Sequence, residues 1–295
     1  MKYCVLGATG RTGGIVATEL LKDGYQVRVV ARSLDKLEPL RALGAEPCVA
    51  DLQVLDDVKR AFADIEAAYV MIPPNFTASD FRKFQDEVTD NIADAIATNG
   101  TKYTVSLSSI GAENPKGVGP VNGLHYMEVQ LDGIPDLNTL HVRAGFFMEN
   151  LLGSLGMIKG MKIYGAACPP DAAWPLISTG DIGHYAAQRL KALNFSGKNV
   201  QFLLGPRDVT GEETARILAA AFGMEALPYV HFTYEDMKKG VVGGGVLPNT
   251  ADLFVELYDG FNKGLLTYHR DTESTTNTKL EDFAAKVLKP AFDSR

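Results

Sequence analysis

The chain has 295 residues, of which 46% are hydrophobic and 22% charged, and its formal net charge is −7. This composition suits a globular protein with one large domain and a smaller companion. An acidic chain is a poor partner for nucleic acid, and no apolar run approaches the ~18 residues that span a bilayer. Because Lys2 and Tyr3 lead directly into a strand-like run and not into a signal peptide, we expect a cytoplasmic protein.

Short apolar runs alternate with helical patterns through the first 145 residues. Strands are expected at 3–6, 26–31, 46–52, 67–72, 101–108 and 137–145. Helices are expected at 13–24, 33–44, 56–65, 79–100 and 123–133. This alternation predicts an α/β fold, a doubly wound parallel sheet with helices on both faces.

The rhythm changes after Gly145, where a helical stretch leads into a proline- and alanine-rich segment at 161–178. A helix at 179–193 and a strand at 198–205 follow, and a helix at 210–223 opens like a capping box, Thr210 to Glu213. We expect residues 1–153 to form an NAD(P)-binding Rossmann domain, with 176–205 returning to it. Residues 206–295 would then form a smaller C-terminal α+β lobe that covers the mouth of the sheet and carries substrate or lid residues.

The stretch "GATGRTG" follows the first strand at once and opens the first helix. Gly7 allows a tight turn, Gly10 lets the backbone approach a ligand, and Gly13 lets the helix pack close to the strand. The free N–H groups and the positive end of the helix favour a pyrophosphate. The three glycines alone are a weak signal, but their place between a strand and a helix predicts a dinucleotide site.

The second strand ends at "VVARS", where an NAD-specific site places a carboxylate for the ribose 2′-hydroxyl. Here Ala31 and Arg32 stand instead, so NADP(H) is favoured over NAD(H), because a guanidinium pairs with a 2′-phosphate. Arg11 offers a second positive contact. The alternative interpretation of Arg32 is a solvated surface arginine. Asp51 falls where such folds cap the adenine, and an N-cap of the helix that follows is an equally good interpretation.

Several stretches together carry a resemblance to a known family: "KYCVLGATGRTGG", "VRVVARSLDKL", "VSLSSIGAE", "LHVRAGFFMEN" and "WPLISTGDIGHYAA". The chain resembles the NmrA-like branch of the atypical short-chain dehydrogenases/reductases from Lys2 to about Lys263. The family is similar to NAD(P)H-dependent quinone and triphenylmethane-dye reductases, and it includes members that bind NADP(H) as redox sensors without turnover. The resemblance therefore implies either a reductase or a non-catalytic, NADP(H)-sensing regulatory protein.

Ordinary short-chain reductases donate a proton from the tyrosine of Y-x-x-x-K. If Glu128 matches the glutamate of this helix in the family, the lysine position is Leu124 and the tyrosine position is Pro120, so both are lost. A shifted register gives Tyr126 with Gln130, which brings no charge to activate the phenol. His125 and Tyr126 are the candidate catalytic proton donors, although a quinone or electron-poor aromatic accepts hydride with little protonic help.

The resemblance also implies a place for each ligand. The residues expected to contact the cofactor are Gly7, Thr9, Gly10, Arg11, Thr12, Gly13, Arg32, Asp51, Leu52, Ile72, Pro73, Ser108 and Gly145. Phe146 and Phe147, with Trp174, are the expected wall for a small aromatic or quinone-like substrate, although core packing is an equally good account of the two phenylalanines. The five histidines show no metal-binding spacing, so we expect no metal.

Overall fold

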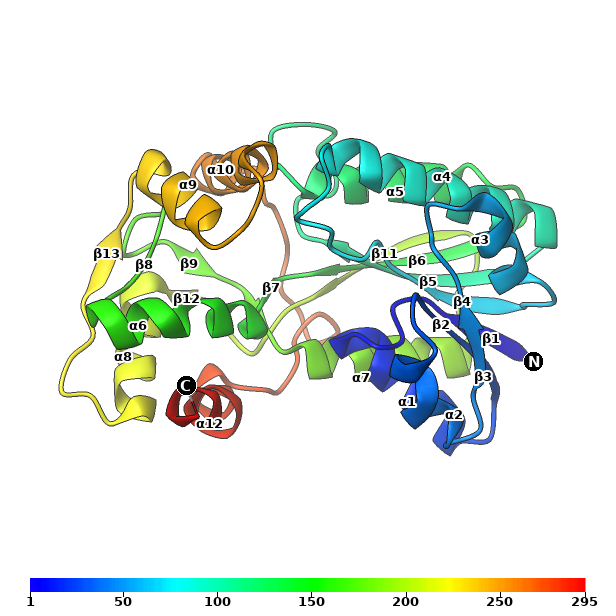
Figure 1. Ribbon diagram of the computed structural model, residues 1–295, viewed down its shortest axis with the longest axis horizontal. Helices are drawn as coiled ribbons and strands as arrows, with labels where there is room; N and C mark the ends of the chain where they lie inside the picture. The colour runs from blue at the N-terminus through cyan, green and yellow to red at the C-terminus, as the bar shows by residue number, and fades with distance from the viewer. Residues whose placement is uncertain (295) are drawn as a thin grey trace.

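The computed structural model describes residues 1–294 and is built on one seven-stranded sheet whose strands are all parallel (Figure 1). Its strands are β1 (Lys2–Val5), β2 (Gln26–Ala31), β3 (Glu46–Val49), β4 (Ala67–Val70), β5 (Tyr103–Ser109), β6 (Asn138–Ala144) and β11 (Lys198–Leu203). Their order is β11-β6-β5-β4-β1-β2-β3. The chain therefore winds outward from β1 in one direction and then from β4 in the other, which confirms the doubly wound fold.

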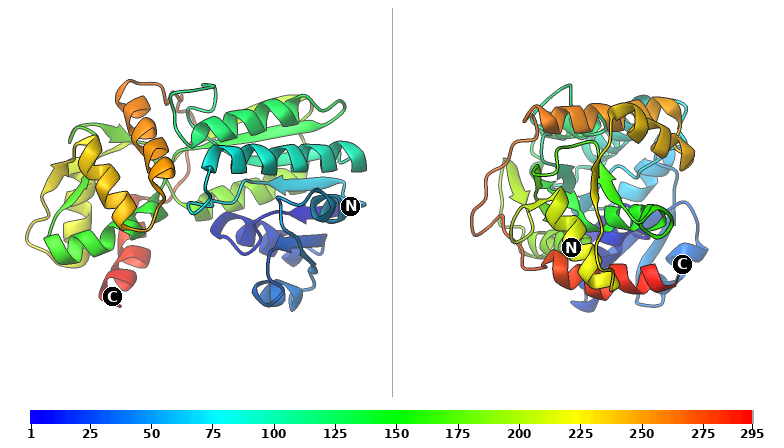
Figure 2. Two further views of the ribbon diagram at one scale, coloured as in Figure 1. Left: turned by 45° about the horizontal axis from the view of Figure 1, so that its top comes forward. Right: turned by 90° about the vertical axis from the view of Figure 1, so that its left-hand side faces the viewer.

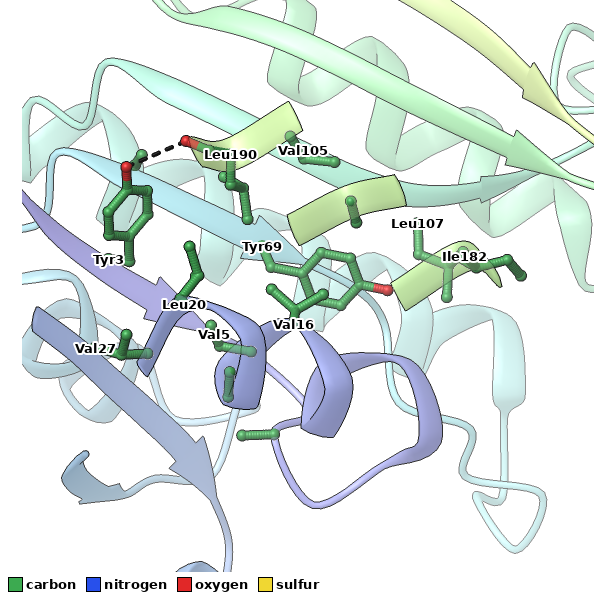
Figure 3. Close-up of a cluster of buried hydrophobic side chains, with 14 of the residues drawn as sticks. Tyr3, Val5, Val16, Leu20, Val27, Tyr69, Val105, Leu107, Ile182 and Leu190 are labelled. Atoms are coloured by element: carbon green, nitrogen blue, oxygen red, sulfur yellow. Dashed lines mark hydrogen bonds between the residues drawn. The ribbon is translucent and has the colours of Figure 1, made fainter. Parts of the chain in front are cut away.

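Helices cover both faces of the sheet, which explains why its inner strands are apolar on both sides (Figure 1). These helices are α1 (Arg11–Lys22), α2 (Glu38–Arg41), α3 (Leu55–Phe62), α4 (Phe81–Asn99), α5 (Val121–Asp132) and α7 (Thr179–Ala192). One core layer packs α1 and α7 against the sheet through Val16, Leu20, Ile182 and Leu190 (Figure 3). The other packs α3, α4 and α5 against the opposite face.

The helix expected at 33–44 is broken into a 3₁₀ turn, η1 (Asp35–Leu37), and the short α2. Pro39 lies in the first turn of α2. A continuous helix would need the missing N–H of this proline and would press its ring against the carbonyl four residues earlier, so the helix restarts there.

A second core lies beside the sheet and belongs to the smaller lobe (Figure 1). The lobe's strands pair in twos: β7 (Phe146–Phe147) with β10 (Leu176–Ile177), β8 (Tyr164–Ala166) with β13 (Tyr229–His231), and β9 (Ala173–Trp174) with β12 (Val209–Thr210). Its helical segments are η2 (Met148–Ser154), α6 (Leu155–Met161), α8 (Gly211–Phe222), α9 (Tyr234–Gly243), α10 (Pro248–Asn262), α11 (Leu280–Phe283), η3 (Ala284–Leu288) and α12 (Lys289–Asp293). The second core also contains Met148, Leu151 and Trp174. Met148 and Leu151 precede residue 153, where the first domain is expected to end, but they pack in the core of the smaller lobe.

Helix α8 begins as its sequence indicates. The Thr210 side chain accepts the backbone N–H of Glu213 at 3.1 Å, which confirms this half of the capping box. The Glu213 carboxylate does not return to the cap, because it pairs with Arg207 at 2.8 Å.

Helix α10 joins the two lobes by lying against the loops that follow β4 and β5 (Figure 2). Asn249 donates to the carbonyl oxygen of Ser79 at 2.6 Å, and Glu256 accepts the N–H of Gly117 at 2.8 Å. A Cβ on Gly119 would lie 1.9 Å from the carbonyl oxygen of Leu253. The smaller lobe thus packs onto the edge of the sheet at which its strands end.

We predict that Gly119→Ala loosens this contact. The residue has φ +56 and no room for a methyl group, so the change should lower the free energy of unfolding by about 2–3 kcal/mol. Urea denaturation measures the loss, and limited proteolysis should show faster cleavage near α10. Gly153→Ala is the control, since no atom lies within 4 Å of its added Cβ. Equal stability of both variants would contradict the close contact.

Candidate functional site

The glycine loop between β1 and α1 is closely packed backbone. Gly7 has φ +61, and a Cβ there would lie 2.6 Å from the sulfur of Met71. The N–H of Gly10 donates to the carbonyl oxygen of Gly7 at 2.8 Å. A Cβ on Gly13 would lie 2.4 Å from that same oxygen, so Gly13 lets α1 begin directly against the end of β1.

The start of α1 is free to receive an anion. Its N-cap is Gly10, no side chain caps it, and its first turn holds no acidic residue. Thr9, Gly10 and Arg11 are exposed. The free N–H groups and the positive end of the helix dipole thus face solvent at the switch point between β1 and β4, which fits a pyrophosphate. Thr12 differs, because its side chain is buried and its hydroxyl accepts from Tyr69 at 2.9 Å.

Arg32 and Arg11 lie on opposite sides of the glycine loop. Arg32 follows β2 and is exposed, and neither arginine forms an ion pair within residues 1–294. Arg11 lines a cavity with residues of α7 and the C-terminal helices, whereas β2 lies on the other side of β1 from β4 and β5. Arg32 thus follows a strand on one side of β1, whereas Arg11 borders the cavity formed with α7 and the C-terminal helices.

Asp51 follows β3 but does not cap α3, which begins four residues later at Leu55. Its carboxylate accepts the N–H of Gln53 at 3.0 Å, and its own N–H donates to Asp57 at 2.9 Å. This is a local turn that places the carboxylate at the ligand edge of the sheet. Leu52 is half-buried beside it, and its carbonyl oxygen accepts from Asn91 at 2.9 Å.

Ser108 belongs to a buried polar cluster at the end of β5. It is buried, and its hydroxyl donates to Glu128 at 2.6 Å. Arg143 holds the same carboxylate with Nε at 3.0 Å and Nη2 at 2.6 Å, and it reaches Glu113 at 3.0 Å. Burial lowers the pKa of Arg143, but the two glutamates outweigh that effect and raise it. Replacing either Glu128 or Arg143 by a neutral residue should lower the free energy of unfolding by about 3–5 kcal/mol, because the partner's charge would stay buried and unpaired.

The two candidate proton donors on α5 point in different directions. The hydroxyl of Tyr126 donates to Asp90 of α4 at 2.8 Å, and this bond, with burial, raises its pKa to about 12. Tyr126 thus binds the neighbouring helix and is a poor acid. Nδ1 of His125 lies 2.8 Å from the carbonyl oxygen of Ala112. Because a carbonyl only accepts, Nδ1 carries a proton and Nε2 is the nitrogen left for other chemistry.

The expected aromatic wall is largely core. Trp174 is 8% exposed and stacks on Phe261 with ring centroids 3.4 Å apart, and its Nε1 donates to the sulfur of Cys168 at 3.3 Å. Phe146 meets Trp174 edge-on, and Phe147 packs against the core of the sheet. Trp174 is buried in the second core and has little surface left for a substrate, whereas Phe146 and Phe147 are half-buried.

The backbone around Gly145 is also committed to the fold. Its N–H donates to the carbonyl oxygen of Leu203 at 3.0 Å, and a Cβ there would lie 2.0 Å from the carbonyl oxygen of Pro175. Gly145 thus lets β6 and the segment before α7 pass each other closely. Ile72 and Pro73 are half-buried at the end of β4, where their exposed faces remain open to a ligand.

A cavity of about 810 Å³ lies between the start of α1, the start of α7 and the C-terminal helices, and we call it the inter-lobe cavity. Its lining residues are Arg11, Ile15, Glu149, Leu152, Ser178, Thr179, Gly180, Asn277, Thr278, Asp282, Phe283, Lys286 and Val287. Of these, the sequence indicated only Arg11 as a ligand contact. The others come from four distant segments, and no local pattern signals their meeting.

Two kinds of site are absent from the described residues. Within residues 1–294, no group of three or more histidine, cysteine, aspartate or glutamate side chains is arranged to hold a metal ion. The same part of the chain contains no helix with both the length and the apolar character needed to cross a membrane.

Comparisons with known proteins support a nucleotide-binding role for the region that contains the glycine loop. A family described as NAD(P)H-binding matches residues 7–130. The NAD(P)H azoreductase of Xenophilus azovorans is 29% identical over 259 residues, which are 86% of this chain and 85% of that protein. The chloroplastic divinyl chlorophyllide a 8-vinyl-reductase of Arabidopsis thaliana is 31% identical over 335 residues, covering 97% of this chain and 76% of that protein. This chain is an NmrA-like atypical short-chain dehydrogenase/reductase.

Solved structures share the fold of this NmrA-like chain. The NADPH-dependent quinone oxidoreductase of Escherichia coli, complexed with NADPH, has a TM-score of 0.83 at 21% identity, over 98% of this chain and 100% of its own. The triphenylmethane reductase of Citrobacter sp., complexed with NADP(H), has a TM-score of 0.81 at 19% identity, over 96% and 99%. These two structures therefore share both lobes of this chain. The NAD(P)H-binding family model matches only part of the larger lobe, residues 7–130.

We predict that Gly13→Ala weakens cofactor binding while the protein remains folded. The added Cβ would meet the carbonyl oxygens of Gly7 and Leu6 at 2.4 and 2.8 Å, so the helix start must move away from the strand. A movement of this kind should weaken NADPH binding at least tenfold, because the N–H groups no longer converge on the pyrophosphate. Calorimetric titration measures the affinity, and Gly160→Ala is the control, because Gly160 has no positive φ and its added Cβ would meet no atom within 4 Å. Unchanged affinity in Gly13→Ala would contradict this role of Gly13.

Proposed function

We propose that the protein is an NADPH-dependent reductase that transfers hydride to a small aromatic or quinone-like molecule. One observation carries this: the start of α1 is open and free of acidic side chains at the switch point of the sheet, and Arg32 follows the neighbouring strand. Those features fit a pyrophosphate with a 2′-phosphate on its adenosine side.

The relatives support the reaction class. Their names describe an azoreductase, a quinone oxidoreductase and a triphenylmethane reductase, and two of their structures hold NADPH or NADP(H). These names favour a reductase over a regulatory protein that binds the cofactor without turnover. They also favour small, flat acceptors.

Arg32 supports the preference for NADP(H) over NAD(H). It is exposed just after β2 and has no ion-pair partner in residues 1–294. The residue before it is Ala31, so the carboxylate that would repel a 2′-phosphate is missing from this position. A guanidinium can bind a phosphate through two parallel hydrogen bonds, whereas it gains little from a 2′-hydroxyl.

The residues of the chain divide the remaining work. Gly7, Thr9, Gly10 and Gly13 would hold the pyrophosphate through backbone N–H groups, Asp51 and Leu52 would border the adenine, and Ile72 and Pro73 would border the nicotinamide ribose. When bound, NADPH supplies the hydride. Helix α10 packs on the loops that follow β4 and β5 and would help to exclude water from the bound cofactor. His125 is held at Nδ1 by Ala112, so a proton on Nε2 is the one it can give.

Steady-state turnover tests the function itself. NADPH oxidation, followed by absorbance with a panel of quinones and azo compounds, should proceed with at least one of them. Tight binding of NADPH without turnover across the panel would instead mark the protein as a cofactor sensor.

Cofactor preference gives the next prediction. Arg32→Ala should raise the Kd of NADPH roughly 10- to 100-fold, because a charge-assisted contact to the 2′-phosphate is lost, and should change the Kd of NADH less than about threefold. Arg41→Ala is the matched control, since Arg41 is also exposed but pairs with Glu38. Equal losses for both nucleotides would refute the assignment of Arg32.

Proton delivery gives another prediction. His125→Gln should lower kcat about tenfold or more for an acceptor that must be protonated, with little change in the KM of NADPH. Tyr126→Phe should leave kcat within about twofold, because that hydroxyl donates to Asp90 and has a pKa of about 12. The pH profiles of both variants check the result. A large loss in Tyr126→Phe alone would move the role of acid back to the tyrosine.

A further inference from the structure

The inter-lobe cavity lies on the nicotinamide side of the glycine loop. Helix α1 packs beneath β1 and β2, and α7 packs beneath β4 and β5. The two helices are in close contact at Gly183 and Ile15. A Cβ added to Gly183 would lie only 2.7 Å from the Cβ of Ile15. The cavity opens where both helices begin. A dinucleotide held at the start of α1, with its adenosine toward Arg32, therefore directs its other end toward this space.

The cavity combines an apolar lining with two unpaired cations. Ile15, Leu152, Phe283 and Val287 supply the apolar part. Val287 is 39% exposed, so the apolar lining extends toward solvent. Arg11 and Lys286 also line the cavity, and neither has an ion-pair partner in the described chain. Apolar surface with a few placed charges is typical of a small-molecule site.

The cavity also holds acidic side chains, and they differ in their partners. Both oxygens of Glu149 accept the N–H of Thr179 at 3.1 Å, so this carboxylate is held at the start of α7. Asp181, nearby, accepts the hydroxyl of Thr278 at 2.8 Å. Asp282 is the carboxylate of the lining without a bonded partner in residues 1–294. The lining thus holds two cations and two acidic side chains, and neither cation is in an ion pair with either acid.

The segment that carries Lys286 and Val287 has an unusual backbone. Residues Ala284–Leu288 form η3, a stretch of π-helix between α11 and α12. Such stretches are rare and occur often at functional sites. Lys286 and Val287, which line the cavity, both belong to this stretch.

We propose that the inter-lobe cavity receives the hydride acceptor, and that it selects a flat apolar molecule bearing an anionic group, such as a carboxylate or sulfonate. The rings lie against Leu152, Phe283 and Val287, and the anion pairs with Arg11 and Lys286. This inference rests on the proposed function, since it names the class of substrate for the same reductase.

The experiment compares one ring system with and without charge. The full chain, with and without saturating NADP⁺, is titrated calorimetrically with naphthalene-2-sulfonate and with naphthalene-2-methanol. The sulfonate should bind about tenfold more tightly, and its advantage should fall as salt is raised. Equal affinities, or no binding of either compound, would overturn the proposal.

Opposed variants separate this site from general effects of charge or folding. K286Q should weaken sulfonate binding roughly three- to tenfold, and D282N should strengthen it by a similar factor, because both charges are exposed and partly screened. K289Q is the matched control, since Lys289 lies on the next helix and pairs with Asp293. Loss of affinity in both K286Q and D282N, or an equal loss in K289Q, would contradict the assignment.

These outcomes are distinguishable from failure of the proposed function. If NADP⁺ binds and a neutral quinone is reduced while the sulfonate shows no advantage, only the anion preference is wrong. If no nicotinamide nucleotide binds, the reductase proposal fails, and the titration without cofactor still decides whether the cavity prefers the anion.

Discussion

The close approach of α1 to the end of β1 is the constraint on which the site depends. Gly13 lies where any side chain would meet the carbonyl oxygen of Gly7, and Gly7 itself turns the chain with a positive φ. Because no side chain intervenes, the first N–H groups of the helix lie at the edge of the sheet, between β1 and β4. Arg32 lies after the neighbouring strand β2, and Arg11 borders the inter-lobe cavity.

Buried polar contacts hold the remainder of this edge in place. Arg143 joins Glu128 of α5 to Glu113 of the loop after β5, and Ser108 completes the group from β5. Helix α10 then fastens the smaller lobe to the same loop through Gly117. Each contact is between separate segments of the chain, so the loops at this edge of the sheet are positioned by tertiary packing and not by their own turns.

Much of the fold could be predicted from periodicity. The parallel sheet, the flanking helices and the Thr210 cap are local or repeat at short spacing, and they were predicted correctly. Side-chain directions at the site could not be predicted this way. Tyr126 turns to Asp90, Trp174 enters the second core, and Ser108 turns to Glu128. In each case a partner far along the chain satisfies a polar group or covers an aromatic face.

The sequence by itself determined the doubly wound sheet, the open glycine loop and the presence of arginine instead of an acid after the second strand. Those features depend on backbone freedom, apolar spacing and one residue's charge, which are readable within a few positions. Only the tertiary structure decided that Arg11 and Lys286, 275 residues apart, line one cavity. The physical reason is that the start of α1 and the C-terminal helices are brought together by packing between the lobes, which depends on every intervening element and has no local pattern.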